Sequence, residues 1–496
     1  MYKVGIIGFG VVGKSVLSFL RDKKIHQACR QQDSLPAKLV MQCQHIAVWD
    51  KRVLDSNELE LLGASSAVFV DGSSLDLAVF IQSNDFVVAS PGIDLGPYQM
   101  FAHKIVTELD FFSAFFCKPV LAITGSAGKT TITKLLGSLA NLVAINTPCN
   151  SEGGTDGGVS CRVAMGGNVG IGMLDLISKQ DEIDVAIIEL SSFQLEFNAH
   201  FTPIVAIYTN VYPNHLDRHK TLDGYWQAKA SMIRLEQSPR VIIASHDLLQ
   251  GQASSLIIDD LVKTRSRIIV TTDQPANLVD VSLPTFDALY MHDTQVILAT
   301  YHDGICTKKH VLIEHIMLPT ITFVANWLQV VAGLYALGFA IEQLPAMLLK
   351  AQSEKLLPEF AHRVRHCATV RGVDFYDDSK STIAQATLAA ANRLALLQRP
   401  IIIIVGGLGK GIDRSWLMDA FANIPQIKKV FCFGPESHQF VGAEACATLA
   451  DVVSAVASSM TPGDIVLFSP SGTSFDFFKN YEHRGQVFEQ LVQKLA

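Results

Sequence analysis

The chain has 496 residues, more than three times the roughly 150 residues of a common domain, so a single compact domain is excluded. Its 40 lysines and arginines against 47 aspartates and glutamates give a net charge of −7 with no long run of either sign, which excludes a nucleic-acid or anionic-membrane surface as the main partner. Hydrophobic residues make up 49% and charged residues 18% of the chain, which excludes a disordered protein.

Strands that alternate with helical stretches follow one another along the whole chain. Residues 1–117 contain predicted strands at Val4–Ile7, His45–Asp50, Ala67–Val70 and Phe86–Ala89, with a helix from Gly13. Residues 118–358 contain Pro119–Ile123, Val185–Leu190, Ile204–Thr209, Val241–Ala244 and Ile268–Val270. Residues 359–496 contain Val373–Tyr376, Ile401–Val405, Val430–Phe433 and Ile465–Phe468. This alternation is typical of parallel sheets, so we predict an α/β fold in three domains.

One segment, Ile321–Ile341, is almost entirely apolar and about as long as a membrane span. Asn326 and Gln329 near its middle, and strands on both sides, favour a buried helix of a soluble protein instead. The nine cysteines form no Cys-x-x-Cys pair, which predicts a reducing compartment. Since the N-terminus lacks the pattern of a signal peptide, we expect a cytoplasmic protein without membrane insertion.

The first glycine-rich loop, Gly8-Phe9-Gly10-Val11-Val12-Gly13, lies between a predicted strand and a helix. Its backbone N–H groups and the helix dipole favour a pyrophosphate, although a tight packing turn would have the same sequence. Asp50 ends the next strand, where an acidic side chain holds the ribose of NAD. Lys51 and Arg52 beside it suit a uracil-bearing ligand equally well, so both alternatives stay open.

A second loop, Thr124-Gly125-Ser126-Ala127-Gly128-Lys129-Thr130-Thr131, is the strongest local signal. It lies between an apolar strand and a helix, and such a loop cradles phosphates. The Lys129 ammonium would contact the β- and γ-phosphate oxygens, and the Thr130 hydroxyl would coordinate Mg²⁺. Ile123 stands where the full phosphate-loop pattern has its first glycine.

Three further residues of the middle domain are candidates for catalysis. Glu189 ends an apolar strand, where a buried carboxylate needs a cation, and Mg²⁺ is the natural one. His215 follows another strand at the edge where α/β sheets place their sites, although a lone histidine is more often structural. Lys229 has no distinguishing pattern, and the sequence favours a solvated lysine on a helix.

Three polar loops follow strands of the last domain. They begin at Asp377-Asp378-Ser379-Lys380, at Gly406-Gly407-Leu408-Gly409-Lys410 and at Ser469-Pro470-Ser471-Gly472. Each could be a simple turn. Because three of them lie at the same edge of one predicted sheet, they indicate a substrate-binding face.

Together these residues resemble the Mur ligase family over nearly the whole chain. The strings that carry the resemblance are Gly166–Gly170, Glu189–Gln194, Asp378–Lys380 and Ser469–Gly485. The resemblance implies a Rossmann-like domain that binds a UDP-sugar (1–117), a phosphate-loop ATPase domain with a mostly parallel sheet (118–358) and a Rossmann-like amino-acid domain (359–496). It also implies a monomer that uses ATP and Mg²⁺ to join UDP-N-acetylmuramoyl-L-alanine to D-glutamate through an acyl phosphate.

The resemblance also implies roles for individual residues. Catalysis and metal binding fall to Lys129, Thr130, Glu189, His215 and a carbamylated Lys229. ATP contacts fall to Gly125, Gly128, Lys129, Thr130, Thr131, Asn326, Arg363, Asp378 and Lys380. The UDP-sugar is assigned to Val11, Val12, Asp50, Arg52, Ser90, Gly92, Asn168 and Gln194, and D-glutamate to Thr382, Lys410, Ser474 and Tyr481.

Some features depart from the family pattern. Phe323 replaces a common second asparagine near Asn326, Leu408 replaces an acidic residue, and Asn214 stands where an aspartate usually precedes the histidine. The glycine-rich insert Ser151–Gly158 reads as a flexible loop with no assigned role. Two rival functions remain: an NAD-dependent dehydrogenase, which leaves the Lys129 loop without a role, and a non-catalytic ATP-driven switch, which leaves the last domain's polar edge without one.

Overall fold

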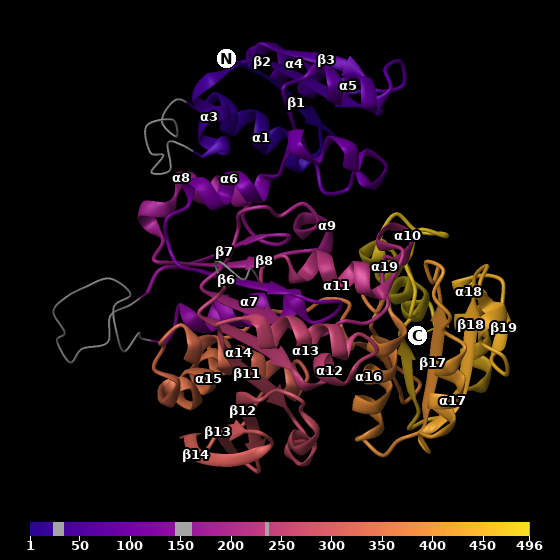
Figure 1. Cartoon of the computed structure of the whole chain (residues 1–496). Helices are drawn as coiled ribbons and strands as arrows, with labels where there is room; N and C mark the ends of the chain where they lie inside the picture. Colours follow the sequence, from indigo (N-terminus) through magenta and orange to yellow (C-terminus); the bar gives the residue numbers. More distant parts are fainter. Residues whose placement is uncertain (23–33, 144–160, 234–237, 496) are drawn as a thin grey trace. The chain divides into compact units, whose positions relative to one another are not determined.

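The structure is a computed structural model that describes residues 1–22, 34–143, 161–233 and 238–495. The insert Ser151–Gly158 lies outside the described residues. The chain forms two compact units (Figure 1): residues 1–211 with 222–358, and residues 212–221 with 359–496. Three separate sheets, mostly parallel and flanked by helices, confirm the predicted α/β class.

The first sheet is parallel throughout, with strand order β3-β2-β1-β4-β5. Its strands are β1 (Tyr2–Ile7), β2 (Cys43–Asp50), β3 (Ala67–Asp71), β4 (Phe86–Ala89) and β5 (Ile105–Val106). Its helices are α1 (Val11–Arg21), α3 (Leu35–Gln42), α4 (Ser56–Ala64) and α5 (Leu77–Ser83). The turn from β1 into α1 is the glycine-rich loop, as the sequence predicts. The helix begins at Val11, two residues before the expected Gly13.

The central sheet has nine strands in the order β14-β13-β12-β11-β10-β9-β6-β8-β7. The parallel part contains β6 (Val120–Thr124), β7 (Val163–Gly167), β8 (Val185–Glu189), β9 (Val205–Tyr208), β10 (Val241–Ser245), β11 (Arg267–Thr272) and β12 (Thr285–His292). The antiparallel strands β13 (Gln295–His302) and β14 (Ile305–Ile313) extend it. The sequence analysis missed β7, β12 and these last two strands. For β14 the reason is that nearly all of its residues are exposed, so they show no apolar alternation.

Helices of the first unit cover the central sheet. They are α6 (Glu108–Phe115), α7 (Lys129–Ala140), α8 (Met173–Ser178), α9 (Ser192–Leu195), α11 (Leu222–Ala230), α12 (His246–Gln250), α13 (Ser254–Lys263), α14 (Val324–Ala336) and α15 (Leu344–Ser353). The apolar segment around Asn326 forms α14, which packs against α7 and over the sheet, with Trp327 fully buried. The prediction of a buried helix is therefore confirmed. In the described part of the chain, every helix is too short or too polar to cross a membrane.

The sheet of the second unit has the order β15-β16-β20-β17-β18-β19 and is parallel apart from β15. Its strands are β15 (Arg365–Val370), β16 (Val373–Asp377), β17 (Ile401–Gly406), β18 (Ile427–Phe433), β19 (Glu444–Cys446) and β20 (Ile465–Phe468). Its helices are α10 (Leu216–His219), α16 (Ala384–Ala395), α17 (Trp416–Ala422), α18 (Leu449–Ser459) and α19 (Tyr481–Gln493).

Alternate side chains of β17 enter two different cores. Ile401 and Ile403 pack with residues of α16 and α17, whereas Ile402 and Ile404 pack with residues of α18 and α19. Successive strand residues point to opposite faces, and both faces of this sheet are covered by helices. This explains why β17 reads as an unbroken apolar run in the sequence.

Candidate active site

Two residues that follow β9 fix the conformation of the loop between β6 and α7 by hydrogen bonds. The Asn210 Oδ1 atom accepts the backbone N–H of Ala127 at 2.8 Å, and the Thr209 hydroxyl donates to the Ala127 carbonyl at 2.6 Å. Gly125 and Gly128 have φ angles of 145° and 85°, and a Cβ on Gly125 would lie 1.9 Å from Thr209 Oγ1. Only glycine fits the crowded first position, so the loop keeps the form that a phosphate group requires.

The cationic end of this loop is Lys129, the first residue of α7. Its ammonium donates to the Gly125 carbonyl at 2.8 Å and to the Ser126 carbonyl at 3.3 Å, so it already lies over the loop. Thr130 is half-buried, whereas Thr131 is buried within the helix. These groups meet at a helix N-terminus, where N–H groups and the helix dipole favour an anion.

Asn326 is brought to this loop from a distant part of the sequence. A Cβ on Gly128 would lie 3.0 Å from the Asn326 Oδ1 atom, while the Asn326 amide nitrogen donates to Thr322 at 2.7 Å. The prediction of Asn326 as a residue of the nucleotide site is consistent with this position. Phe323, the departure from the family pattern, is the N-cap residue of the same helix.

Glu189, at the end of β8, is buried, and one of its oxygens is unsatisfied. Oε1 accepts a hydrogen bond from the Asn168 amide at 2.9 Å. Oε2 has no hydrogen-bond partner among the described residues. A buried carboxylate oxygen without a donor is costly. Oxygen ligands are what Mg²⁺ requires, so Glu189 and the Thr130 hydroxyl fit this ion.

Lys229 on α11 is buried, with an exposed fraction of 1%, so the expectation of a solvated helix lysine is wrong. Its ammonium nitrogen donates to the Gly125 carbonyl at 3.0 Å and to Thr124 Oγ1 at 3.3 Å, and it lies 4.5 Å from the centre of the Tyr225 ring. Burial, and secondarily the charge of Lys129, holds the pKa of Lys229 well below its usual value, although Glu189 acts in the opposite direction. The site thus favours a neutral amine.

The carboxyl ends of β1, β2 and β4 form a second polar site in the first unit. Asp50 Oδ2 accepts the Phe9 backbone N–H at 2.7 Å and the Arg52 guanidinium at 3.0 Å. Burial opposes ionisation of Asp50, but the bonds from Arg52 and Phe9 outweigh it, and the pKa is lowered. The other oxygen, Oδ1, accepts the backbone N–H of Arg52. Both carboxylate oxygens are therefore engaged in orienting Arg52, and neither is left to bind a ribose hydroxyl. This arrangement disfavours the NAD alternative.

The remaining residues expected to contact the UDP-sugar divide between two places. Ser90 donates to the Gly8 carbonyl at 3.0 Å, Gly92 is exposed, and Val11 is 86% exposed at the first turn of α1. Val12, its neighbour, is half-buried. Gln194 instead follows β8, and its Oε1 atom completes the capping box of α9 with Ser191. A ligand contact of Gln194 would therefore use its amide nitrogen.

In the second unit, Asp378 is buried after β16. It accepts hydrogen bonds from Ser469 at 2.7 Å and from the Val364 backbone at 3.2 Å. Burial raises its pKa to about 7, while the Ser469 bond and Arg363 oppose the rise. The Lys380 ammonium lies 3.5 Å from the centre of the Tyr481 ring, a close cation–π contact.

The residues expected to bind the amino acid belong to this same unit, where Tyr481 is the first residue of α19 and the other three lie in loops. Lys410, in a left-handed backbone conformation, donates to the Asn214 side-chain oxygen at 2.8 Å. Ser474 is buried and Thr382 is half-buried. His215, which precedes α10, has a positive φ of 54° and belongs to the segment 212–221 of this unit.

Several buried charges of the second unit were missed by sequence reasoning. Arg414 and Arg484 are almost fully buried, and each donates to backbone carbonyls of the polar loops. His362 and Asp377 are joined at 2.5 Å, which raises the pKa of the histidine. An isolated arginine or histidine in a loop carries no periodic signal, so only the packing reveals these residues.

Comparisons with known proteins find similar sequences and similar folds. Residues 123–299 match the family model of the Mur ligase middle domain. The chain is therefore similar to a Mur ligase over its middle part, and it is similar to full-length relatives over nearly its whole length. The chain is 29% identical to the UDP-N-acetylmuramoylalanine–D-glutamate ligase of Vibrio cholerae serotype O1 (strain El Tor Inaba N16961), with 99% of this chain and 98% of the relative covered. It is 28% identical to the enzyme of the same name from Desulfotalea psychrophila, with 99% and 95% covered.

Solved structures support the fold. The structure resembles MurF from Acinetobacter baumannii with a TM-score of 0.55 at 16% sequence identity, over 97% of this chain and 98% of that one. It also resembles Escherichia coli FolC in complex with DHPP and ADP, with a TM-score of 0.51 at 12% identity, over 82% and 100%. At these identities the likeness concerns the fold alone.

Proposed function

We propose that this chain is an ATP-dependent ligase that joins D-glutamate to UDP-N-acetylmuramoyl-L-alanine in the synthesis of peptidoglycan precursors. The observation that carries the proposal is the similarity to D-glutamate ligases over 99% of the chain. In this proposal residues 1–117 bind the UDP-sugar, residues 118–358 bind ATP and residues 359–496 bind the amino acid. We expect the reaction in the cytoplasm, where ATP is supplied.

The first step transfers the γ-phosphoryl group of ATP to the substrate carboxylate. The carboxylate oxygen forms the new P–O bond, the bond between the β- and γ-phosphates breaks, and ADP leaves. Lys129 would neutralise charge on the transferring group, and the loop from Gly125 to Gly128 would hold the phosphates by its N–H groups. Asn326, Arg363, Asp378 and Lys380 would contact the rest of the nucleotide.

Mg²⁺ would be held by Thr130 and Glu189, and a second ion by His215 and Lys229. The ion would supply positive charge opposite the phosphate oxygens. A neutral Lys229 amine can attack CO₂, forming a C–N bond and releasing one proton, and the resulting carbamate offers oxygen ligands. The buried position and lowered pKa of Lys229 support this modification, because a protonated amine has no lone pair for the attack.

In the second step the amine of D-glutamate attacks the acyl phosphate and inorganic phosphate leaves. Lys410, Thr382, Ser474 and Tyr481 would hold the two carboxylates of the amino acid. The amine must lose its proton before it attacks, so the carboxylates, rather than the amine, have to provide the binding contacts. A site that pairs a second carboxylate should reject D-alanine, whose binding would leave donors unsatisfied.

The test is phosphate release with ATP, Mg²⁺ and UDP-N-acetylmuramoyl-L-alanine, with a panel of D- and L-amino acids. We expect release that depends on D-glutamate and a product of the corresponding mass. Release without any amine would indicate the ATP-driven switch. Equal turnover with D-alanine would assign the chain to a ligase of different specificity.

A further inference from the structure

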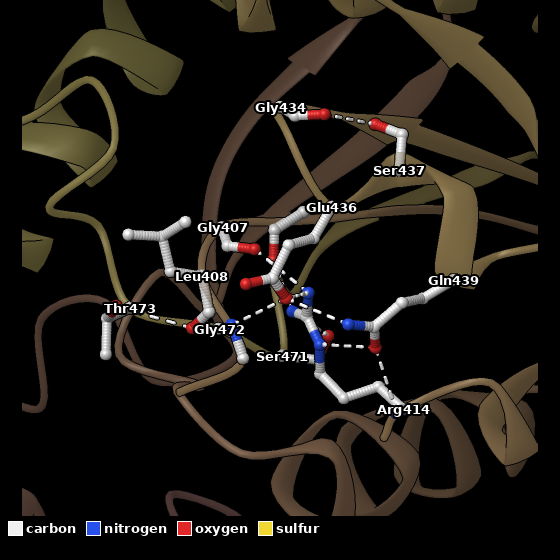
Figure 2. A network of polar contacts seen from close by, with 12 residues as sticks. Gly407, Leu408, Arg414, Gly434, Glu436, Ser437, Gln439, Ser471, Gly472 and Thr473 are labelled. Atoms are coloured by element: carbon white, nitrogen blue, oxygen red, sulfur yellow. Dashed lines mark hydrogen bonds and ion pairs between the residues drawn. The ribbon is translucent and has the colours of Figure 1, made fainter. Parts of the chain in front are cut away.

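Arg414 is a buried cation whose hydrogen bonds all go to protein groups of the second unit. It lies between β17 and α17 with an exposed fraction of 1%. Its Nη1 atom donates to the Gly406 carbonyl at 2.9 Å and to the Ser471 hydroxyl at 3.3 Å. Its Nη2 atom donates to the Gly407 carbonyl at 3.0 Å and to Glu436 Oε2 at 2.8 Å. Figure 2 shows this guanidinium at the centre of the network.

The partners of Arg414 come from three loops, and each loop follows a different strand. Gly406 ends β17 and Gly407 follows it, Glu436 follows β18, and Ser471 follows β20. These strands are parallel neighbours, so their carboxyl ends lie at one edge of the sheet. One planar side chain with five N–H donors thus connects three loops, and its bond to Ser471 spans 57 residues of the sequence.

The same network reaches the neighbours of two residues expected to bind the amino acid. Glu436 Oε2 also accepts the backbone N–H of Gly409 at 2.9 Å, next to Lys410. Leu408 and Thr473 exchange backbone hydrogen bonds at 3.0 Å and 2.8 Å, and Ser474 follows Thr473. The positions of Lys410 and Ser474 therefore depend on one shared support.

The guanidinium of Arg414 packs so closely against two glycines that neither position has room for a side chain. A Cβ on Gly472 would lie 2.5 Å from its Nη1 atom, and a Cβ on Gly409 would lie 2.8 Å from its Nε atom. Burial lowers the pKa of Arg414, while Glu436 opposes this change. Burying a guanidinium costs free energy unless its N–H groups find acceptors. All three nitrogens of Arg414 have an acceptor here, because Nε donates to Gln439 Oε1 at 3.4 Å.

We propose that Arg414 is a positioning residue for the amino-acid site: it fixes the loops of Lys410 and Ser474 so that both can hold the carboxylates of the acceptor. The inference rests on the proposed function. In this role Arg414 acts through the loops that it supports. Its loss should therefore weaken acceptor binding selectively, because a displacement of about 1 Å in a binding group can cost up to a hundredfold.

The test compares Arg414→Met with a matched control, Arg399→Met, in steady-state kinetics. Arg399 also bonds two carbonyls and one carboxylate, those of Gly463, Asp464 and Asp374, but at the opposite edge of the same sheet. In Arg414→Met we expect KM for D-glutamate to rise on the order of tenfold or more, with KM for ATP and for the UDP-sugar changed by less than about twofold. In Arg399→Met all three KM values should stay near those of the wild type.

If Arg414→Met does not fold, a second variant, Glu436→Gln, tests whether the Arg414 network positions the amino-acid site. It removes the charge that Arg414 and the Gly409 N–H share, while the shape is kept, and KM for D-glutamate should again rise alone. An unchanged KM for D-glutamate in the folded variants, or an equal rise in all three KM values, would overturn the inference. Failure of the proposed function would look different, because the wild type itself would then make no product with D-glutamate.

Discussion

Replacing Lys229 with methionine should greatly lower activity and leave the free energy of unfolding almost unchanged. The apolar side chain has a similar length, so the packing of α11 against the end of β6 is kept. Lys229 makes two hydrogen bonds, to the Gly125 carbonyl and to Thr124 Oγ1, each worth about 1 kcal/mol. Both acceptors keep another contact, because the Gly125 carbonyl still receives Lys129 and the Thr124 hydroxyl still donates to Leu190.

The loss of those bonds is offset by a gain. Removing the polar amine from water costs about 1–3 kcal/mol, and methionine removes that cost. We therefore expect the free energy of unfolding to change by less than about 1 kcal/mol. Activity should fall by about 10²–10³ or more, because the residue proposed to hold the second Mg²⁺ is gone.

The assay pairs urea unfolding with phosphate release, and Lys263→Met, at an exposed lysine of α13, serves as the control. Partial recovery of Lys229→Ala by formate or another small carboxylate would support the carbamate. The reasoning is refuted if Lys229→Met loses more than about 3 kcal/mol of stability, since inactivity would then reflect unfolding. Activity within tenfold of the wild type would equally refute it.

Three further predictions concern other parts of the site. Lys129→Ala should lower phosphate release by about 10²–10³ without shifting the thermal midpoint, and near wild-type turnover at saturating ATP would contradict the phosphate-loop assignment. Asn214→Asp should give Lys410 an anionic partner and raise KM for D-glutamate roughly fivefold, whereas an unchanged KM would show that this contact does not compete with substrate. The hydrogen bond to Asp377 raises the pKa of His362 above its ordinary value of 6.5. This pair therefore stabilises the folded protein fully below pH 6.5, and the stabilisation is lost as the pH rises through the pKa of the folded state. In urea unfolding, the wild type should therefore exceed His362→Gln in free energy of unfolding by an amount that decreases as pH rises. A difference that stays constant with pH would count against the ion pair.

Much of the fold could be predicted from the sequence because it depends on local patterns. Apolar runs such as Ile401–Val405 identify strands buried on both faces, and the glycines of residues 124–128 identify a loop that approaches phosphate. Parallel strands bring their carboxyl ends to one edge, so the order of strands and polar residues along the chain is enough to group those residues into a site. The antiparallel strand β14 was missed because almost all of its residues are exposed, so they show no apolar alternation.

The sequence by itself determined the α/β class, the phosphate loop and the polar strand ends, since each is written in neighbouring residues. Only the tertiary structure decided that Lys229 is a buried amine with a lowered pKa, and that Arg414 joins three loops from the interior. The physical reason is that burial and ionisation depend on segments far apart in the chain. A helix lysine or a loop arginine has the same local sequence whether water or protein surrounds it.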